Sequence, residues 1–194
     1  MSLILASQSP RRKELLSQLG VQFQTRPADI DETPLSGESP MDYVLRLSIE
    51  KARCIARSQS GTWVLGSDTT VVRGEAILGK PEDEEDAVSM LLSLSGKTHQ
   101  VLTAVALVKD EKVLSRVVST QVCFREITES MARAYWATEE PCDKAGSYGI
   151  QGLGGMLVRS IDGSYSSVVG LPLAETADLL MEAKIEGWWS WHQE

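Results

Sequence analysis

The chain has 194 residues, 42% of them hydrophobic and 24% charged, which are ordinary values for a globular protein with its own core. Its formal net charge of −8 argues against a nucleic-acid partner, which requires clustered basic surface, whereas a small phosphate ligand remains compatible. The N-terminus has no basic leader and only a short apolar run, so we expect a cytoplasmic protein without signal peptide or membrane anchor. We expect residues 1–194 to form one domain.

The first predicted elements are a buried strand and a capped helix. Residues 3–6 are an apolar run that favours an inner strand, and Ser9 before Pro10 is typical of an N-cap followed by proline at the first helical position. We expect this helix to end at Gly20. The polar side chains near its first turn are Ser7, Ser9, Arg11 and Arg12. Together with unpaired backbone N–H groups they suit a phosphate, and the alternative is a capped helix with two solvated arginines.

Strand and helix patterns alternate along the rest of the chain. The segments that favour strands are 21–26, 63–66, 76–78, 98–108, 113–127, 156–161 and 165–169, and residues 70–73 continue the extended pattern of 63–66. The segments that favour helices are 40–55, 83–94, 128–138 and 171–183. We expect 98–108 to pair with 113–127, and 156–161 with 165–169, as antiparallel strands. The pattern therefore predicts an α/β fold with a mixed twisted β-sheet and flanking helices.

Two charged residues occupy unusual places in these elements. Lys51 is seven residues from Val44, close to two helical turns, so we expect it to face inward with the apolar side of its helix and to need a counter-charge. Asp68 follows a predicted strand, where a side chain can reach into a crevice at the strand end. The alternative for Asp68 is a turn-forming role.

Several motifs resemble one known family. S-x-S-P-R-R after an N-terminal strand resembles the signature of the Maf family of nucleoside triphosphate pyrophosphatases, and the similarity continues through LGSDT, LGKP, LSG-x-THQV, DKAGSYGIQG and VVGLP. The resemblance implies an ITPase-like mixed sheet in two lobes around a central cleft. It also implies hydrolysis of nucleoside triphosphates with a divalent cation such as Mg, Mn or Co. A homodimer is a further expectation, supported by the tail residues Trp188, Trp189 and Trp191.

The resemblance gives the candidate residues roles in phosphoanhydride cleavage, which depends mainly on positioning and on neutralising phosphate charge. Asp68 is implied as general base, and it could instead bind the metal. Glu32 could ligate the metal or orient water, while a solvated acidic loop is its alternative. The cations that could converge on one triphosphate are Arg11, Arg12, Lys51 and Lys80. Solvated surface is the alternative for each of these four.

Base selection is inferred from Gln151. Its carboxamide offers both an acceptor and donors, so it could pair with N3–H and O4 of uracil or thymine, whereas a carboxylate would suit guanine. Within the family, the branch acting on dTTP and UTP resembles this chain at Arg11, Thr69 and Gln151. We therefore expect dTTP and UTP, or modified pyrimidine nucleotides, as substrates. The alternative substrates are 7-methyl-GTP or CTP, and the alternative function is a nucleotide-binding regulator of septum formation with little turnover. Gln151 could instead shape the loop, and Thr69 could merely cap or pack.

Overall fold

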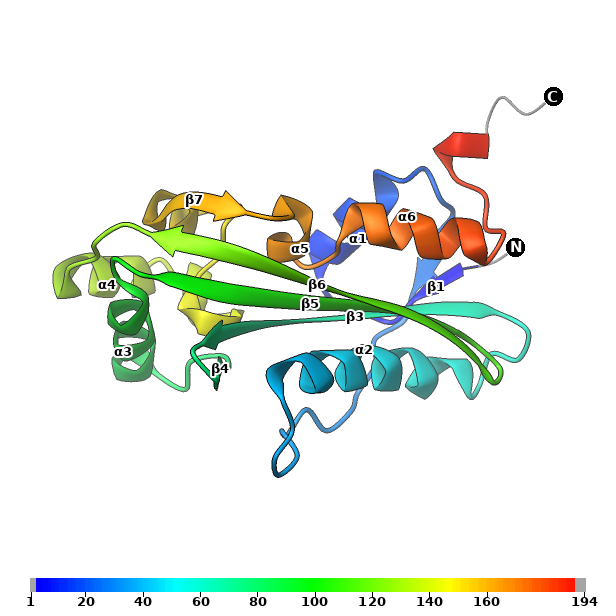
Figure 1. The fold of residues 1–194 in the computed structure, drawn as a ribbon, viewed down its shortest axis with the longest axis horizontal. Coiled ribbons are helices and arrows are strands. Elements are labelled where there is room, and N and C mark those ends of the chain that lie inside the picture. Colours follow the sequence, from blue (N-terminus) through cyan, green and yellow to red (C-terminus); the bar gives the residue numbers. More distant parts are fainter. Residues whose placement is uncertain (1–2, 191–194) are drawn as a thin grey trace. The chain divides into compact units, whose positions relative to one another are not determined.

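The computed structural model describes residues 3–190, and within that range the chain forms a seven-stranded sheet with helices beside it (Figure 1). The strands are β1 (Leu3–Leu5), β2 (Phe23–Thr25), β3 (Trp63–Arg73), β4 (Ala76–Leu78), β5 (Thr98–Lys109), β6 (Lys112–Phe124) and β7 (Val158–Asp162). The helices are α1 (Pro10–Ser17), α2 (Pro40–Ala56), α3 (Glu84–Leu94), α4 (Glu129–Trp136), α5 (Tyr165–Val169) and α6 (Leu173–Glu182). Short 3₁₀ helices are η1 (Glu140–Asp143), η2 (Ala145–Ser147), η3 (Leu153–Leu157) and η4 (Trp188–Ser190).

The sheet is mixed, as the sequence predicts. Its strand order is β2-β1-β3-β5-β6-β7, with β4 beside β3. Strand β1 pairs in parallel with both β2 and β3, whereas β4 pairs with β3 and β7 with β6 in antiparallel fashion. Strands β5 and β6 are neighbours joined only by Asp110 and Glu111, so they run antiparallel. The α/β fold class with a mixed sheet and flanking helices is confirmed.

The chain divides into two compact units. The described part of unit 1 is residues 3–68, 103–118 and 170–190, and unit 2 is residues 69–102 and 119–169. Strands β3, β5 and β6 each begin in one unit and end in the other. The single functional domain and the central cleft stay predictions.

In unit 1 the two faces of the strands bury alternate residues. Ile4 of β1 and Ala6, which directly follows β1, pack with Ala52 of α2 in one apolar cluster. Leu3 and Leu5, which alternate with them, are fully buried on the opposite face. Figure 1 shows α2 on one side of these strands and α1 and α6 on the other. Within residues 3–190 no helix is long and apolar enough to cross a bilayer.

Unit 2 has its own apolar core, to which α3 contributes Leu91 and Leu94 and α4 contributes Tyr135. Arg133 of α4 lies within 3.0 Å of carboxylates of Glu84 and Glu85 of α3 and of Glu129, which holds the two helices together. The buried His99 ring packs edge-on against Phe124 and Tyr148, and its Nε2 lies 2.9 Å from the Tyr148 hydroxyl. Burial lowers the pKa of His99 to about 4, so the ring is neutral at physiological pH.

Three expectations about local structure are wrong. Asp68 lies in the middle of β3 and not after a strand, because the extended backbone continues through residues 69–73. Residues 165–169 form helix α5 and not a strand, because the Ser164 hydroxyl accepts the Ser167 N–H at 3.2 Å and starts a helical turn that overrides the strand propensity of the valines. Helix α1 ends at Ser17 and not at Gly20. Residues 18–20 form turns that continue from the helix, and Gly20 ends them with a positive φ of 67°. Of the tail tryptophans, Trp188 is exposed, Trp189 is half-buried and Trp191 lies outside the described residues.

Candidate functional site

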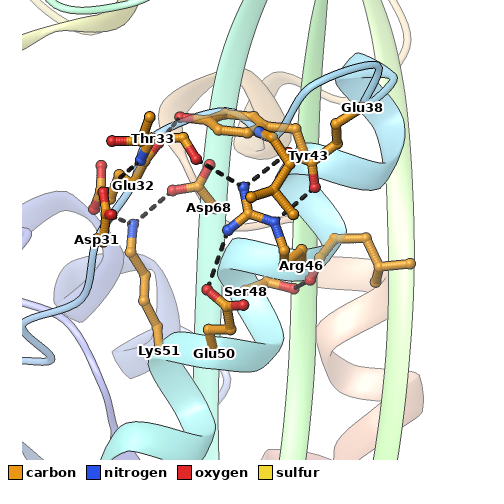
Figure 2. Close-up of polar contacts among 12 residues, drawn as sticks. Asp31, Glu32, Thr33, Glu38, Tyr43, Arg46, Ser48, Glu50, Lys51 and Asp68 are labelled. Carbon is orange, nitrogen blue, oxygen red and sulfur yellow. Dashed lines mark hydrogen bonds and ion pairs between the residues drawn. The ribbon is translucent and has the colours of Figure 1, made fainter.

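A buried lysine of α2 contacts two acidic side chains of unit 1. Lys51 Nζ lies 2.6 Å from Asp68 Oδ1 and 2.8 Å from Glu32 Oε1 (Figure 2). The Lys51 and Asp68 side chains are only 11% and 9% exposed, whereas that of Glu32 is 48% exposed. The prediction that Lys51 faces inward beside a counter-charge is therefore confirmed.

Close packing of α2 on β3 brings Lys51 to Asp68. A Cβ atom on Gly66 would overlap the carbonyl oxygen of Ser48 and lie 2.8 Å from the backbone nitrogen of Ala52. Only glycine allows the helix to approach the strand this closely, two residues before Asp68 and beside Lys51. Gly66 was not predicted as a site residue, although a glycine inside a buried strand indicates a close backbone approach.

The loop that carries Glu32 is attached to α2 by two side chains. Arg46 forms a fork to Glu38, with Nε 2.6 Å from Oε1 and Nη2 2.8 Å from Oε2, and the same Nη2 donates to the Thr33 carbonyl at 3.1 Å (Figure 2). The Tyr43 hydroxyl donates to the Glu32 carbonyl at 3.0 Å. Burial, with the nearby Asp68 and Glu32 carboxylates, raises the pKa of Tyr43 to about 12, so it remains a neutral donor. Tyr43 and Arg46 were not predicted as site residues.

The start of α1 has the predicted cap. Ser9 is the N-cap residue, its Oγ accepts the Arg12 N–H at 3.4 Å, and Pro10 occupies the first turn. The Ser9 N–H in turn donates to Ser7 Oγ at 3.1 Å. Each hydroxyl thus accepts one backbone N–H, and its own O–H is a further donor group beside the helix start. A helix start of this kind favours an anion through its N–H groups and dipole.

Arg12 is held by the backbone of a segment distant in sequence. Its Nε donates to the Gly170 carbonyl at 2.9 Å, and the buried Ser67 hydroxyl lies 3.0 Å from the same oxygen. Burial lowers the pKa of Arg12, while the negative charge of Asp68 opposes that shift. Arg12 therefore lies within electrostatic range of Asp68, whereas half-buried Arg11 adds repulsion. Ser67 and Gly170 were not predicted as site residues.

The remaining candidates belong to unit 2. Thr69 follows Asp68 in β3, Lys80 is exposed after β4, and Gln151 is exposed in the turn before η3. The Gly146 N–H donates to the Gly79 carbonyl at 3.0 Å, which joins the segment of Lys80 to the loop preceding Gln151. The structure thus brings Glu32, Lys51 and Asp68 into direct contact, while Lys80 and Gln151 stand on separate loops.

The acidic residues of unit 1 suit one kind of metal ion. Within residues 3–190 no group of three or more His, Cys, Asp or Glu side chains could hold a metal by itself. Glu32 and Asp68 supply two carboxylates around Lys51. A magnesium-like ion commonly binds through one or two carboxylates together with waters and substrate phosphates, so this donor set fits such an ion.

Comparison with known proteins identifies close relatives. A family model described as Maf-like protein matches residues 2–183. Three relatives, each named dTTP/UTP pyrophosphatase, match nearly the whole chain. The one from Colwellia psychrerythraea is 54% identical over 95% of this chain and 90% of its own length. The one from Vibrio parahaemolyticus is 54% identical over 94% and 97%, and the one from Shewanella sp. is 55% identical over 95% and 100%.

A solved structure has a weaker likeness. A HAM1 protein from Coxiella burnetii is 20% identical, with a TM-score of 0.45 over 64% of this chain and 73% of its own. A likeness of this strength bears on neither the fold nor the site.

Proposed function

The chain belongs to the Maf-like protein family, and from that premise we propose that it hydrolyses dTTP and UTP to the nucleoside monophosphate and pyrophosphate. The names of its relatives support this substrate class. The structural observation that carries the proposal is the buried Lys51 ammonium, which reaches the carboxylates of Asp68 and Glu32.

In this proposal Asp68 is the general base. Its carboxylate accepts a proton from the water that attacks the α-phosphorus, and Lys51 holds the carboxylate in place through their 2.6 Å contact. Pyrophosphate leaves as the phosphoanhydride bond breaks, and charge on the phosphate oxygens must be neutralised. The groups we assign to phosphate binding are Ser7, Ser9, Arg11, Arg12, Lys51 and Lys80, together with the N–H groups at the start of α1.

A divalent cation such as Mg, Mn or Co fits the carboxylates of unit 1. Glu32 would hold it, with Asp68 as the second candidate ligand and phosphate oxygens completing the set. When bound, such an ion neutralises negative charge on the triphosphate. Tyr43 and Arg46 fix the Glu32 loop through its carbonyl groups and Glu38.

Base selection is assigned to Gln151, Thr69 and Arg11. The Gln151 carboxamide accepts from N3–H and donates to O4 of uracil or thymine, and Thr69 and Arg11 contribute to the same preference. A base that lacks this donor and acceptor pattern leaves polar groups of the amide unpaired, which lowers its kcat/KM.

Pyrophosphate release from a panel of triphosphates tests the proposed function. The panel contains dTTP, UTP, CTP, GTP, ATP and 7-methyl-GTP, each at saturating Mg, Mn or Co. We expect dTTP and UTP to have the highest kcat/KM. A preference for another base would contradict the pyrimidine assignment, and binding of nucleotides without turnover would indicate a regulator instead of an enzyme.

We also propose that the protein is a homodimer. The support is apolar surface near the C-terminus, where the Trp188 side chain is 55% exposed and packs edge-on against Trp189. Light scattering at micromolar concentration should report twice the mass of the chain. A mass of one chain at every concentration tested would contradict the dimer.

A further inference from the structure

We propose that Glu140 is a positioning residue for base selection, because its carboxylate fixes the loop of residues 149–154 and thereby the place of Gln151. The inference rests on the proposed function, since the position of Gln151 matters for selection only if this side chain contacts the base. Glu140 itself would touch neither substrate nor metal.

The Glu140 carboxylate accepts three hydrogen bonds. Its Oε1 accepts the Tyr135 hydroxyl at 2.7 Å and the Gly154 N–H at 3.0 Å, and its Oε2 accepts the Leu153 N–H at 2.8 Å. Burial would raise the pKa of Glu140, but these three donors and the charge of Lys144 outweigh it, and the pKa is lowered. The side chain therefore stays an ionised acceptor for the backbone of the loop.

The loop is attached at its two ends to two different side chains, Tyr135 and Glu140, which are hydrogen-bonded to each other. On the N-terminal side of Gln151, the Gly149 N–H donates to the Tyr135 hydroxyl at 3.1 Å. On the C-terminal side, Leu153 and Gly154 donate to Glu140. The Gln151 side chain is exposed and has no hydrogen-bond partner among residues 3–190. Its position therefore depends on how the backbone on either side of it is held.

The glycines of the loop are fitted to these two side chains. A Cβ atom on Gly152 would overlap the Glu140 carboxylate, and one on Gly154 would overlap the Tyr135 hydroxyl and lie 2.7 Å from the Gly149 carbonyl oxygen. These glycines allow the backbone to approach the acceptor closely enough for its N–H groups to bind. The positions of Gly152 and Gly154 in the sequence are explained by their close approach to Glu140 and Tyr135, and not by a nucleotide-binding fingerprint.

Glu140 is well placed to act as an anchor because its own backbone is held. It opens η1, and its carbonyl oxygen accepts Lys144 Nζ at 2.5 Å. Its N–H donates to the Thr138 hydroxyl at 3.3 Å, just after α4. The carboxylate therefore transmits the position of α4 and η1 to the loop that carries Gln151.

The test compares UTP with CTP in a series of variants. Glu140→Gln keeps the size of the side chain but turns one oxygen into an amide group that cannot accept an N–H, and Glu140→Ala removes the acceptor. We expect the UTP to CTP ratio of kcat/KM to fall roughly fivefold or more for Glu140→Gln and further for Glu140→Ala. The loss should reside in KM for UTP, with kcat nearly unchanged. Glu139→Gln is the matched control, because Glu139 is an exposed neighbour without these contacts, and its ratio should equal that of the wild type.

A double variant separates positioning from a general effect on the fold. In the Gln151→Ala background, Glu140→Gln should change the UTP to CTP ratio no further, because the residue through which it acts is gone. Tyr135→Phe removes one donor to Glu140 and the acceptor of the Gly149 N–H but keeps the ring and the backbone donors of Leu153 and Gly154. It should lower the ratio less than Glu140→Ala, and it serves as a second probe if Glu140→Ala fails to fold.

The possible failures are distinguishable. If Gln151→Ala lowers the ratio and Glu140→Gln does not, the positioning role is wrong and the proposed function stands. An equal loss for UTP and CTP, accompanied by a lower melting temperature, would make Glu140 merely structural and also overturn the inference. A wild-type protein with no preference for UTP would overturn the proposed base selection and, with it, the role of Glu140.

Discussion

The buried Lys51 contacts one buried carboxylate, that of Asp68, and one half-exposed carboxylate, that of Glu32. This difference in burial determines how substitutions at the three positions affect stability. Asp68 has little access to water, so it depends on Lys51 for charge compensation. Glu32 is half-exposed and can be solvated instead. Without Lys51, the buried Asp68 carboxylate would lose its charge compensation, whereas Glu32 would remain solvated. Without Asp68, Lys51 would still be paired with Glu32.

The first prediction concerns this pair. Lys51→Met should lower the free energy of unfolding by about 3 kcal/mol, because it leaves the Asp68 carboxylate buried and unpaired. Adding Asp68→Asn should restore more than half of that loss without restoring turnover. Denaturant titration of both variants checks this, with Lys80→Met as control at an exposed lysine. If Lys51→Met were as stable as the wild type, the ion pair would carry no net stabilisation.

Gln151→Glu should shift base preference. The change replaces the amide donor facing O4 by a second acceptor, so UTP and dTTP should lose roughly five- to 150-fold in kcat/KM. CTP should lose less, because its N4 amino group presents a donor at the same place. Steady-state kinetics with UTP, dTTP, CTP and GTP measure the effect. An equal loss for all four would assign Gln151 to phosphate or water positioning.

Among the secondary-structure elements, α2 has the largest part in building the site. Its inward side chain Lys51 reaches Asp68 in the middle of the neighbouring strand β3, and its first turns hold the Glu32 loop through Tyr43 and Arg46. One helix thus orients both carboxylates with respect to each other. Gly66 makes this possible, because it lets α2 lie directly on β3.

Arg46→Lys tests the role of the helix in placing Glu32. Lysine keeps the charge but cannot form the fork to Glu38 while also donating to the Thr33 carbonyl. We expect the magnesium concentration for half-maximal activity to rise roughly tenfold, with melting little changed. Arg53→Lys, at an exposed position of the same helix, is the control. A higher KM for UTP with unchanged magnesium dependence would argue that Glu32 does not hold the metal.

Local signals in the sequence predicted the elements and the inward lysine well. The cap at Ser9 and the period of α2 depend on residues a few positions apart, so they can be read from the chain alone. The contact between Arg46 and the Thr33 carbonyl joins a side chain to a backbone group in an irregular loop. No periodic pattern of residues in the sequence predicts such a contact. Helix α5 was missed because a single capping serine outweighed residues that favour strands.

For the whole molecule, the buried polar groups link stability to pH. His99 has a folded pKa of about 4, below the 6.5 of an exposed histidine. The unfolded chain therefore binds a proton between these values that the folded chain does not. The contribution of His99 to stability is complete above pH 6.5 and is lost as pH falls toward 4.

The pH dependence of the unfolding free energy should differ between the wild type and His99→Gln. Between pH 7 and pH 4 the neutral His99 should account for about 3 kcal/mol of lost stability. His99→Gln keeps a partner for the Tyr148 hydroxyl but cannot titrate, so its unfolding free energy should fall less steeply over this range. Equal slopes for the two proteins would show that the ring is protonated in the folded state or exchanges with solvent there.

In the proposed reaction, water activated by Asp68 attacks the α-phosphorus of a pyrimidine nucleoside triphosphate. Hydrolysis of UTP in ¹⁸O-labelled water, followed by mass spectrometry of the products, shows which phosphorus the water attacks. We expect UMP that carries one ¹⁸O atom, unlabelled pyrophosphate, and a rate at least about 100-fold lower for Asp68→Asn. Label in pyrophosphate, formation of UDP and phosphate, or near-normal turnover of Asp68→Asn would contradict it.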